Sequence, residues 1–193
     1  MNDIASSLDA LPCHLSPATI NRHKAAISGA LTYACSKSHI NTNPARLVPY
    51  IAENNNRTRF LSNDERSRLF KACKASKWDK LYLIVLMAIT TGARKGELMN
   101  LKWEDVDLVR QTAFVQTTKN GLPKVLPLTD SVIKELQQYK WDKGLLFPSP
   151  LIPSKPLCFT KHWQRALKDA DIEDFTFHCL RHSCASYLAM NGS

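Results

Sequence analysis

Residues 175–190 read FTFHCLRHSCASYLAM, and the spacing of basic and apolar side chains in this stretch decides the predicted fold. His178 lies three positions before Arg181 and four before His182. Side chains at these spacings share one face of a helix, so the three can converge on one ligand. We therefore predict a helix with a cationic face that can also move protons.

The opposite side of the same helix is predicted to be buried. Leu180, Cys184 and Leu188 recur every fourth residue and form an apolar stripe. A second basic position lies upstream in residues 90–108, TTGARKGELMNLKWEDVDL, where Arg94 follows a glycine turn at the start of a short helix. The sequence thus places two arginines on or beside helices.

Composition points to a basic globular protein. The chain has 193 residues, enough for one full core and a small extra piece, and its apolar fraction of 44% is ordinary. The formal net charge is +9 and the isoelectric point is about 9.3, a surplus that attracts nucleic acid. A basic domain without a nucleic-acid role is the alternative, but the patterned positions of the basic residues favour nucleic acid.

The cysteines do not form a disulfide framework. None of the six belongs to a C-x-x-C pair, and several fall on apolar helix faces, where a free thiol packs as a small hydrophobic group. We find no secretion signal and no apolar run long enough to span a membrane. These features predict a protein of the reducing cytoplasm that makes no membrane contact.

The N-terminal part is predicted to hold one long helix. Residues 1–12 carry little pattern and are expected to fray. Ser16 and Pro17 suit the N-cap and the first helical position. The helix that follows has an apolar stripe predicted to be buried, made of Ile20, Ile27, Leu31 and Ala34.

Three polar side chains of that helix, Thr19, Arg22 and His23, fall largely away from the stripe. They can meet a phosphate or a groove, or simply face solvent, and the spacing alone does not separate these alternatives. A boundary follows at residues 51–60, IAENNNRTRF, because three consecutive asparagines favour turns and open loops. We place the division between residues 1–57 and 58–193.

The second domain is predicted to be mainly helical with one hairpin. It opens with SNDE, a capping box in which Ser62 is the N-cap and Glu65 reaches back. Asn120-Gly121 is a strong hairpin turn. Helices are expected at residues 62–74, 78–90, 94–101, 131–141 and 160–170 and from Cys179, strands at 111–117 and 124–128, and a turn at 103–108. We therefore predict an α+β fold, mainly α with a small antiparallel β-hairpin.

Arg94 and Arg181 form the first candidate pair. Arginine stays protonated in a site and presents a planar fork to two phosphate oxygens. Two such forks can hold a phosphate whose negative charge grows in a transition state. Taken singly, each arginine is more often a surface or ion-paired residue.

Lys119 and His178 are candidates for proton transfer. Lys119 lies beside the hairpin turn and can protonate a leaving oxygen if nearby arginines depress its pKa, although a solvated turn lysine is the plainer alternative. Histidine titrates near neutral pH, which suits His178 to the same task. His182 can act likewise or be a buried, hydrogen-bonded histidine that holds the start of the helix.

A metal site built on the histidines and cysteines is the rival interpretation. The zinc-protease motif needs a glutamate directly after its first histidine, but Cys179 occupies that position. Arg181 lies between the two histidines, and a cation there disfavours a second cation. The sequence has no Gly-rich phosphate loop and no G-x-S-x-G elbow. We predict neither a metal nor a cofactor.

Taken in order, these motifs resemble those of the tyrosine recombinases, or phage-type integrases. The match consists of T-G-A-R-x-G-E-L, then a hairpin with T-K-x-G, then H-x-L-R-H-x-x-A-S-x-L. It covers roughly residues 16–193. The resemblance implies a catalytic domain at residues 58–193, C-terminally incomplete, and a partial helical core-binding domain of SAM-like type with a linker at residues 1–57.

The resemblance implies a role for each candidate. Arg94 and Arg181 are similar to the arginines that clamp the non-bridging oxygens of the scissile phosphate. Lys119 resembles the hairpin lysine that acts as general acid on the departing 5′ oxygen, and His178 resembles the histidine that assists proton transfer at the nucleophile. Glu97 resembles a structural acid beside the first arginine, which an ordinary ion pair explains equally well.

The implied reaction is site-specific cleavage and rejoining of DNA strands through a covalent 3′-phosphotyrosine, without metal or ATP. The implied partner is double-stranded DNA at attachment sites, on which the full-length family acts as a tetramer, in a bacterium or a phage-infected host. Thr19, Arg22 and His23 become candidates for DNA contacts, because their helix resembles the groove-facing one.

The chain departs from the family pattern at both ends. The family's nucleophilic tyrosine lies beyond the H-x-L-R-H helix, and Tyr187, six residues after Arg181, is better interpreted as a packing residue. Several helices of the family's core-binding domain precede the counterpart of the helix at Ser16. We therefore expect a fragment of a recombinase that binds and positions DNA. The alternative is a non-catalytic DNA-binding remnant of a prophage integrase.

Overall fold

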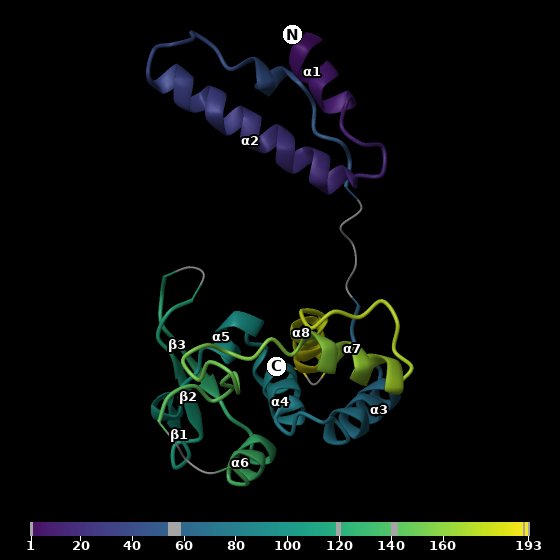
Figure 1. The fold of residues 1–193 in the computed structure, drawn as a ribbon, viewed down its shortest axis with the longest axis vertical. Coiled ribbons are helices and arrows are strands. Elements are labelled where there is room, and N and C mark those ends of the chain that lie inside the picture. The colour runs from purple at the N-terminus through teal and green to yellow at the C-terminus, as the bar shows by residue number, and fades with distance from the viewer. Residues whose placement is uncertain (1, 54–58, 119–120, 140–142, 191, 193) are drawn as a thin grey trace. The chain divides into compact units, whose positions relative to one another are not determined.

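The structure is a computed structural model that describes residues 2–53, 59–118, 121–139, 143–190 and 192. The chain forms two compact units, unit 1 at residues 1–57 and unit 2 at residues 58–193. Unit 1 is helical and unit 2 combines helices with a small sheet (Figure 1). Within the described ranges, no helix is both long and apolar enough to cross a membrane.

Unit 1 consists of α1 (Asn2–Asp9), α2 (Pro17–Ser36) and the short 3-10 helix η1 (Pro44–Leu47). The expectation that residues 1–12 fray is wrong for Asn2–Asp9, because α1 packs on α2 and buries Leu8. The N-cap at Ser16 is confirmed, since its hydroxyl accepts the amide of Thr19 at 3.3 Å.

The interior of unit 1 is polar, and this corrects the predicted apolar stripe of α2. All four residues of that stripe are only half-buried, whereas Asn21 and Lys24 are buried. Asn21 donates to the carbonyl of Ile51 at 2.8 Å and accepts the amide of the same residue at 3.0 Å. The ammonium of Lys24 lies 3.3 Å from the centre of the Tyr50 ring. The returning segment 48–53 therefore binds α2 through directional contacts.

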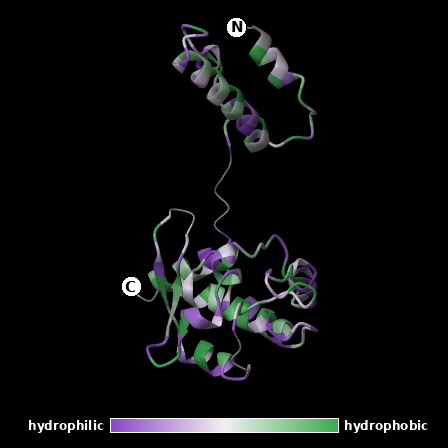
Figure 2. Ribbon diagram, turned by 60° about the vertical axis from the view of Figure 1, so that its left-hand side comes forward, coloured by the Kyte–Doolittle hydropathy of each residue, from purple (hydrophilic) through white to green (hydrophobic). Residues whose placement is uncertain are grey.

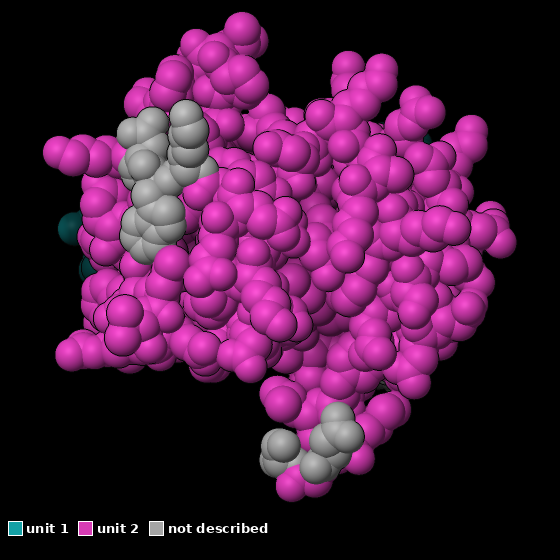
Figure 3. Space-filling model, turned by 90° about the horizontal axis from the view of Figure 1, so that it is seen from below, with its two compact units in different colours: residues 1–57 teal, residues 58–193 magenta. Residues whose placement is uncertain are grey.

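Unit 2 confirms the predicted α+β class. Its helices are α3 (Asn63–Lys74), α4 (Leu81–Thr91), α5 (Lys95–Met99), α6 (Asp130–Leu136), α7 (Thr160–Asp169) and α8 (Cys179–Met190). The apolar α4 is the centre of the core, because eight of its side chains are buried, and it packs against α3, α6 and α8. Figure 2 shows hydrophobic residues along the helices and strands of unit 2, and Figure 3 shows one face of this unit in space-filling form, coloured magenta.

The sheet has three antiparallel strands in the order β1-β2-β3, not the two that were predicted. Its strands are β1 (Val106–Asp107), β2 (Thr112–Val115) and β3 (Lys124–Pro127), and the 3-10 helix η2 (Trp103–Asp105) precedes them. The turn expected at residues 103–108 therefore contains the strand β1. The sequence did not predict this strand, because two residues are too few to show an alternating pattern. Of the predicted hairpin turn, Asn120 lies outside the described residues, while Gly121 has a positive φ of 77°.

Candidate active site

The turn after α4 sets the geometry of the site. Gly92 caps α4 with a φ of 61°, and its amide donates to the carbonyl of Ala88 at 3.1 Å. A Cβ atom at this position would lie 3.3 Å from the sulfur of Cys184 on α8. Glycine alone meets both demands without strain, since it lacks a Cβ and adopts positive φ freely. The turn therefore lets α4 and α8 approach closely.

Arg94 follows this turn as the N-cap residue of α5, and the buried carboxylate of Glu97 holds it. The amide of Arg94 donates to Glu97 Oε2 at 2.9 Å, and its Nη1 donates to Oε1 at 2.8 Å. The Arg94 side chain keeps 38% of its surface exposed, against 4% for Glu97. The carboxylate thus fixes one edge of the guanidinium and leaves the rest accessible to a ligand.

Glu97 remains ionised in this setting. Burial alone raises the pKa of its carboxyl group, but two hydrogen bonds from Arg94 and the positive charges of Lys124 and Arg94 lower it below the ordinary value. Hydrogen bonds to the charged form outweigh the desolvation here. The site therefore has a fixed negative charge that orients its first arginine.

Arg181 reaches the same turn from α8. Its Nη1 donates to the carbonyl of Gly92 at 2.6 Å, across 89 positions of sequence. Because Gly92 lies two residues before Arg94, this bond brings both predicted arginines to the C-terminal end of α4. The two guanidinium groups are each fixed by one partner, a carboxylate for Arg94 and a backbone carbonyl for Arg181.

Of the two candidates for proton transfer, His178 and Lys119, the structure describes only His178. His178 is exposed just before α8, and its ring lies 5.1 Å from that of half-buried His182, nearly perpendicular to it. Lys119 lies outside the described residues. Among the residues that are described, no group of three or more His, Cys, Asp or Glu side chains is arranged to hold a metal ion.

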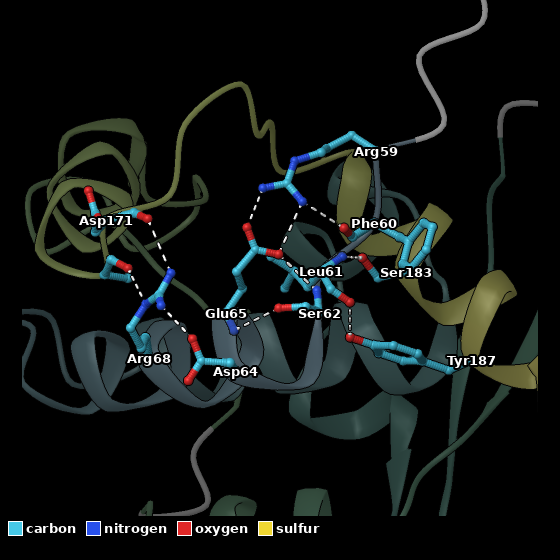
Figure 4. Close-up of polar contacts among 11 residues, drawn as sticks. Arg59, Phe60, Leu61, Ser62, Asp64, Glu65, Arg68, Asp171, Ser183 and Tyr187 are labelled. Carbon is cyan, nitrogen blue, oxygen red and sulfur yellow. Dashed lines mark hydrogen bonds and ion pairs between the residues drawn. The ribbon is translucent and has the colours of Figure 1, made fainter.

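The other side of α8 is bound by residues 59–62, which we call the entry segment (Figure 4). The amide of Leu61 donates to Ser183 Oγ at 3.0 Å, and the hydroxyl of Tyr187 donates to the carbonyl of Leu61 at 2.8 Å. Ser183 is fully buried and also donates to the carbonyl of Cys179 at 3.0 Å. The helix that presents Arg181 is thus bonded to the entry segment as well as to the Gly92 turn.

The entry segment is itself anchored on α3. Arg59 forms an ion pair with Glu65, and its guanidinium lies 5.6 Å from the centre of the Phe175 ring. The capping box is confirmed, because Glu65 accepts the amide of Ser62 at 2.8 Å and donates its own amide to Ser62 Oγ at 3.1 Å. The hydrogen bond from Arg59 lowers the pKa of Glu65 to about 2, against the opposing effect of burial.

Two sequence predictions for α8 have different outcomes. The packing role of Tyr187 is confirmed, because its ring packs against the core and its hydroxyl bonds to Leu61. The buried stripe is correct for Leu180 and Cys184 but wrong for Leu188, which is 52% exposed. The difference arises because the last turn of α8 extends beyond the described core.

Three contributors to the site were missed by sequence reasoning: Leu61, Ser183 and Lys124. The first two bind each other across 122 positions, and no local pattern signals such a contact. Lys124 did leave a signal, because it alternates with Leu126 and Leu128, which are both buried. A strand with that alternation directs its lysine toward the core side of the sheet.

The DNA-binding candidates of unit 1 lie on the first turns of α2. Arg22 and His23 are exposed, as a contact with a large ligand requires. Thr19 is half-buried, and its hydroxyl shares a hydrogen bond with Ser16 Oγ at 3.0 Å. Thr19 therefore already takes part in the N-cap, while the other two side chains face outward.

Comparisons with known proteins identify the family of this chain. The family model described as "Phage integrase family" matches residues 59–193. An integrase of Salmonella phage P22 is 29% identical over 178 residues, 84% of this chain and 45% of that protein. A shufflon-specific DNA recombinase of Escherichia coli is 32% identical over 153 residues, 79% of this chain and 38% of that protein. The chain thus spans less than half the length of these two curated relatives.

Solved structures share the fold. Lambda integrase, residues 75–356 bound to DNA, superposes with a TM-score of 0.79 at 23% identity, covering all of this chain and 72% of that one. The catalytic domain of bacteriophage HP1 integrase gives a TM-score of 0.57 at 27% identity over 69% of this chain and 73% of that one.

Proposed function

This chain belongs to the phage integrase family, and from that premise we propose that it is part of a site-specific DNA recombinase whose Arg94 and Arg181 hold the scissile phosphate. The single observation that carries the proposal is the Gly92 turn. There Arg181 donates to the carbonyl of Gly92, two residues before Arg94, and the buried carboxylate of Glu97 orients Arg94. Preorganised cations lower a barrier most when they need not rearrange as charge develops.

Each side chain takes one step of the reaction. Arg94 and Arg181 neutralise the non-bridging oxygens while a tyrosine oxygen bonds to phosphorus and the bond from phosphorus to the 5′ oxygen breaks. Lys119 gives its proton to the departing 5′ oxygen, and His178 assists proton transfer at the nucleophile. The phosphotyrosyl bond keeps the energy of the phosphodiester, so the reverse attack reseals the strand without ATP, metal or cofactor.

Double-stranded DNA is the proposed partner. One similar protein is a shufflon-specific DNA recombinase and another is lambda integrase bound to DNA, and the net charge of +9 suits a polyanionic ligand. We assign the catalytic role to residues 58–193 and a core-binding role to residues 1–57. In that role Arg22 and His23 contact DNA, with Thr19 at the start of the same helix. The whole protein acts as a tetramer on attachment sites in the cytoplasm.

We call Arg94 and Arg181 together the phosphate clamp. Binding of the chain to a short DNA duplex, measured over a range of salt concentrations, tests this clamp. Affinity falls with salt because phosphate contacts release counterions, by a slope of about 0.9 for each phosphate neutralised. We expect Arg181→Gln and Arg94→Gln each to reduce that slope by about 1. Arg165→Gln, an exposed arginine paired with Asp169 on α7, is the matched control and leaves the slope unchanged. Equal effects of all three substitutions would contradict the clamp.

A nicked duplex separates strand cleavage from binding. We expect the 193-residue chain to bind nicked DNA without forming a covalent adduct, because Tyr187, the tyrosine that follows Arg181, is bonded within the core. An adduct that maps to Tyr187 would overturn this assignment. For the whole protein we expect an adduct that Arg181→Gln abolishes. Full binding without any adduct from the whole protein would instead support a non-catalytic DNA-binding role.

A further inference from the structure

The register of the sheet places Lys124 on the core side of the β2–β3 pair. Lys124 is directly paired with Val115, which is buried. Directly opposed residues in an antiparallel pair project from the same face. The next pair, Phe114 and Val125, projects from the other face and is exposed. Lys124 is half-buried, which fits a long side chain that starts on the inner face and ends at its rim.

The charge of Lys124 acts on both groups that frame the two arginines. It lowers the pKa of Glu97, the carboxylate that orients Arg94. It also opposes the effect of burial, which raises the pKa of Cys184, the thiol that contacts the Gly92 turn. Glu97 and Cys184 both lie beside the turn at the C-terminal end of α4, so the charge of Lys124 acts where Arg94 and Arg181 meet.

These groups leave the site with surplus positive charge. Arg94 and Arg181 meet at the Gly92 turn, and the charge of Lys124 acts there on Glu97, whose carboxylate already accepts two hydrogen bonds from Arg94. A cation that served only to balance Glu97 would be redundant in such a cluster. A lysine ammonium on a flexible stem is well suited to a phosphate oxygen, because it binds as a point charge from many directions.

We propose that Lys124 is a further phosphate-binding residue, which contacts the DNA backbone at the position held by Arg94 and Arg181. The inference rests on the proposed function and deepens it, since it adds a third cation to the clamp. Its task is separate from that of Lys119, which gives up a proton. Lys124 contributes its charge from β3.

The test compares Lys124→Gln with Lys134→Gln, a lysine in the last turn of α6 that is exposed. Binding to a short duplex is measured from low to moderate salt. We expect Lys124→Gln to weaken binding several-fold and to reduce the salt slope by about 1, and Lys134→Gln to change neither. Lys124→Arg keeps the charge and restores the slope. An unchanged slope for Lys124→Gln, or an equal loss for Lys134→Gln, would overturn the inference.

Two further measurements keep the outcomes distinct. Arg181→Gln is measured in parallel. If it reduces the slope and Lys124→Gln does not, only the inference fails, whereas if neither does, the proposed function fails with it. The side-chain CH2 signal of Lys124 next to its nitrogen is also followed by NMR in the unaltered chain as duplex is added. The Lys124 signal should shift on addition of duplex, while the Lys134 signal should not change. Because this measurement uses the unaltered chain, it tests the inference even if Lys124→Gln does not fold.

Discussion

The two units of this chain are stabilised by different kinds of interior. In unit 2 most buried side chains are apolar and form one cluster around α4, and Glu97 and Ser183 are the buried polar residues among those described. In unit 1 the buried residues among those described are Leu8, Asn21, Lys24, Asn43 and Ala45, of which three are polar or charged. Apolar burial is non-directional, whereas a buried amide must find its hydrogen-bond partners.

The contrast explains where precision comes from in each unit. Unit 2 gains stability from packed area and places its arginines with a few hydrogen bonds at the Gly92 turn. Unit 1 uses hydrogen bonds for the framework itself, because Asn43 donates to the carbonyl of Ser28 and to the hydroxyl of Thr32, each at 2.9 Å. Substitutions should therefore act by volume in unit 2 and by lost partners in unit 1.

The largest effect is expected from Leu180→Ala in α8. Leu180 is fully buried, so the substitution leaves a cavity and should cost about 2–5 kcal/mol of unfolding free energy. All four tryptophans of the chain lie in unit 2, so their fluorescence in urea reports on that unit. Leu188→Ala, on the same helix but half-exposed, should change the free energy by less than about 0.5 kcal/mol. Equal losses of unfolding free energy in Leu180→Ala and Leu188→Ala would contradict the claim that apolar burial stabilises unit 2.

In unit 1 the sharpest substitution is Asn43→Ala. It removes the donor to Ser28 and Thr32 and the acceptor of the Ala45 amide, so it should cost about 1–3 kcal/mol. Hydrogen exchange of the α2 amides measures the loss, with the exposed Asn41→Ala as the control. Unaltered exchange in Asn43→Ala would show that polar contacts do not stabilise this unit.

Substitution of one glycine in each unit should change stability in opposite directions. Gly92→Ala should destabilise unit 2 by about 1–2 kcal/mol, because φ is 61° and the new Cβ meets the Cys184 sulfur. Gly29→Ala lies within α2 with open space around it and should instead stabilise that helix by roughly 0.5–1 kcal/mol. Thermal unfolding of both variants checks the opposite signs, and a neutral Gly92→Ala would refute the close approach of α4 and α8.

The smallest effect concerns pH and the anchor of the entry segment. Because the pKa of Glu65 falls from 4.5 to about 2 on folding, its ion pair with Arg59 stabilises unit 2 fully above pH 4.5 and is lost as pH falls toward 2. After allowance for solvent screening, the contribution is about 1 kcal/mol. In Glu65→Gln the decline in stability across that range should be shallower by this amount, as measured by urea unfolding at several pH values. An identical decline in both proteins would contradict the assignment.

Much of unit 2 could be predicted from local sequence. The apolar run of α4, the SNDE capping box and the strands β2 and β3 each have a pattern within a few residues. Arg94 and Arg181 could be chosen because motifs in the right order surround them. Their placement at one turn could not be predicted from spacing, because it depends on a bond between α8 and Gly92 across 89 positions.

The predictions that failed share a physical cause. Helix α1, the two-residue strand β1 and the polar interior of α2 all depend on tertiary contacts, and hydrophobic periodicity carries no information about them. Asn21 is buried because the returning backbone of Ile51 offers it both a donor and an acceptor. A sequence pattern that assigns amides to the surface misses such a residue.

The most direct test of the phosphate clamp is NMR of the arginine side-chain N–H groups during titration with inorganic phosphate. We predict that the signals of Arg94 and Arg181 shift together with one affinity, that Arg181→Gln abolishes the shift of Arg94, and that Arg165 does not respond. Shifts of Arg94 and Arg181 that fit separate affinities, or that do not exceed the shift of Arg165, would contradict the claim that the two arginines hold one phosphate.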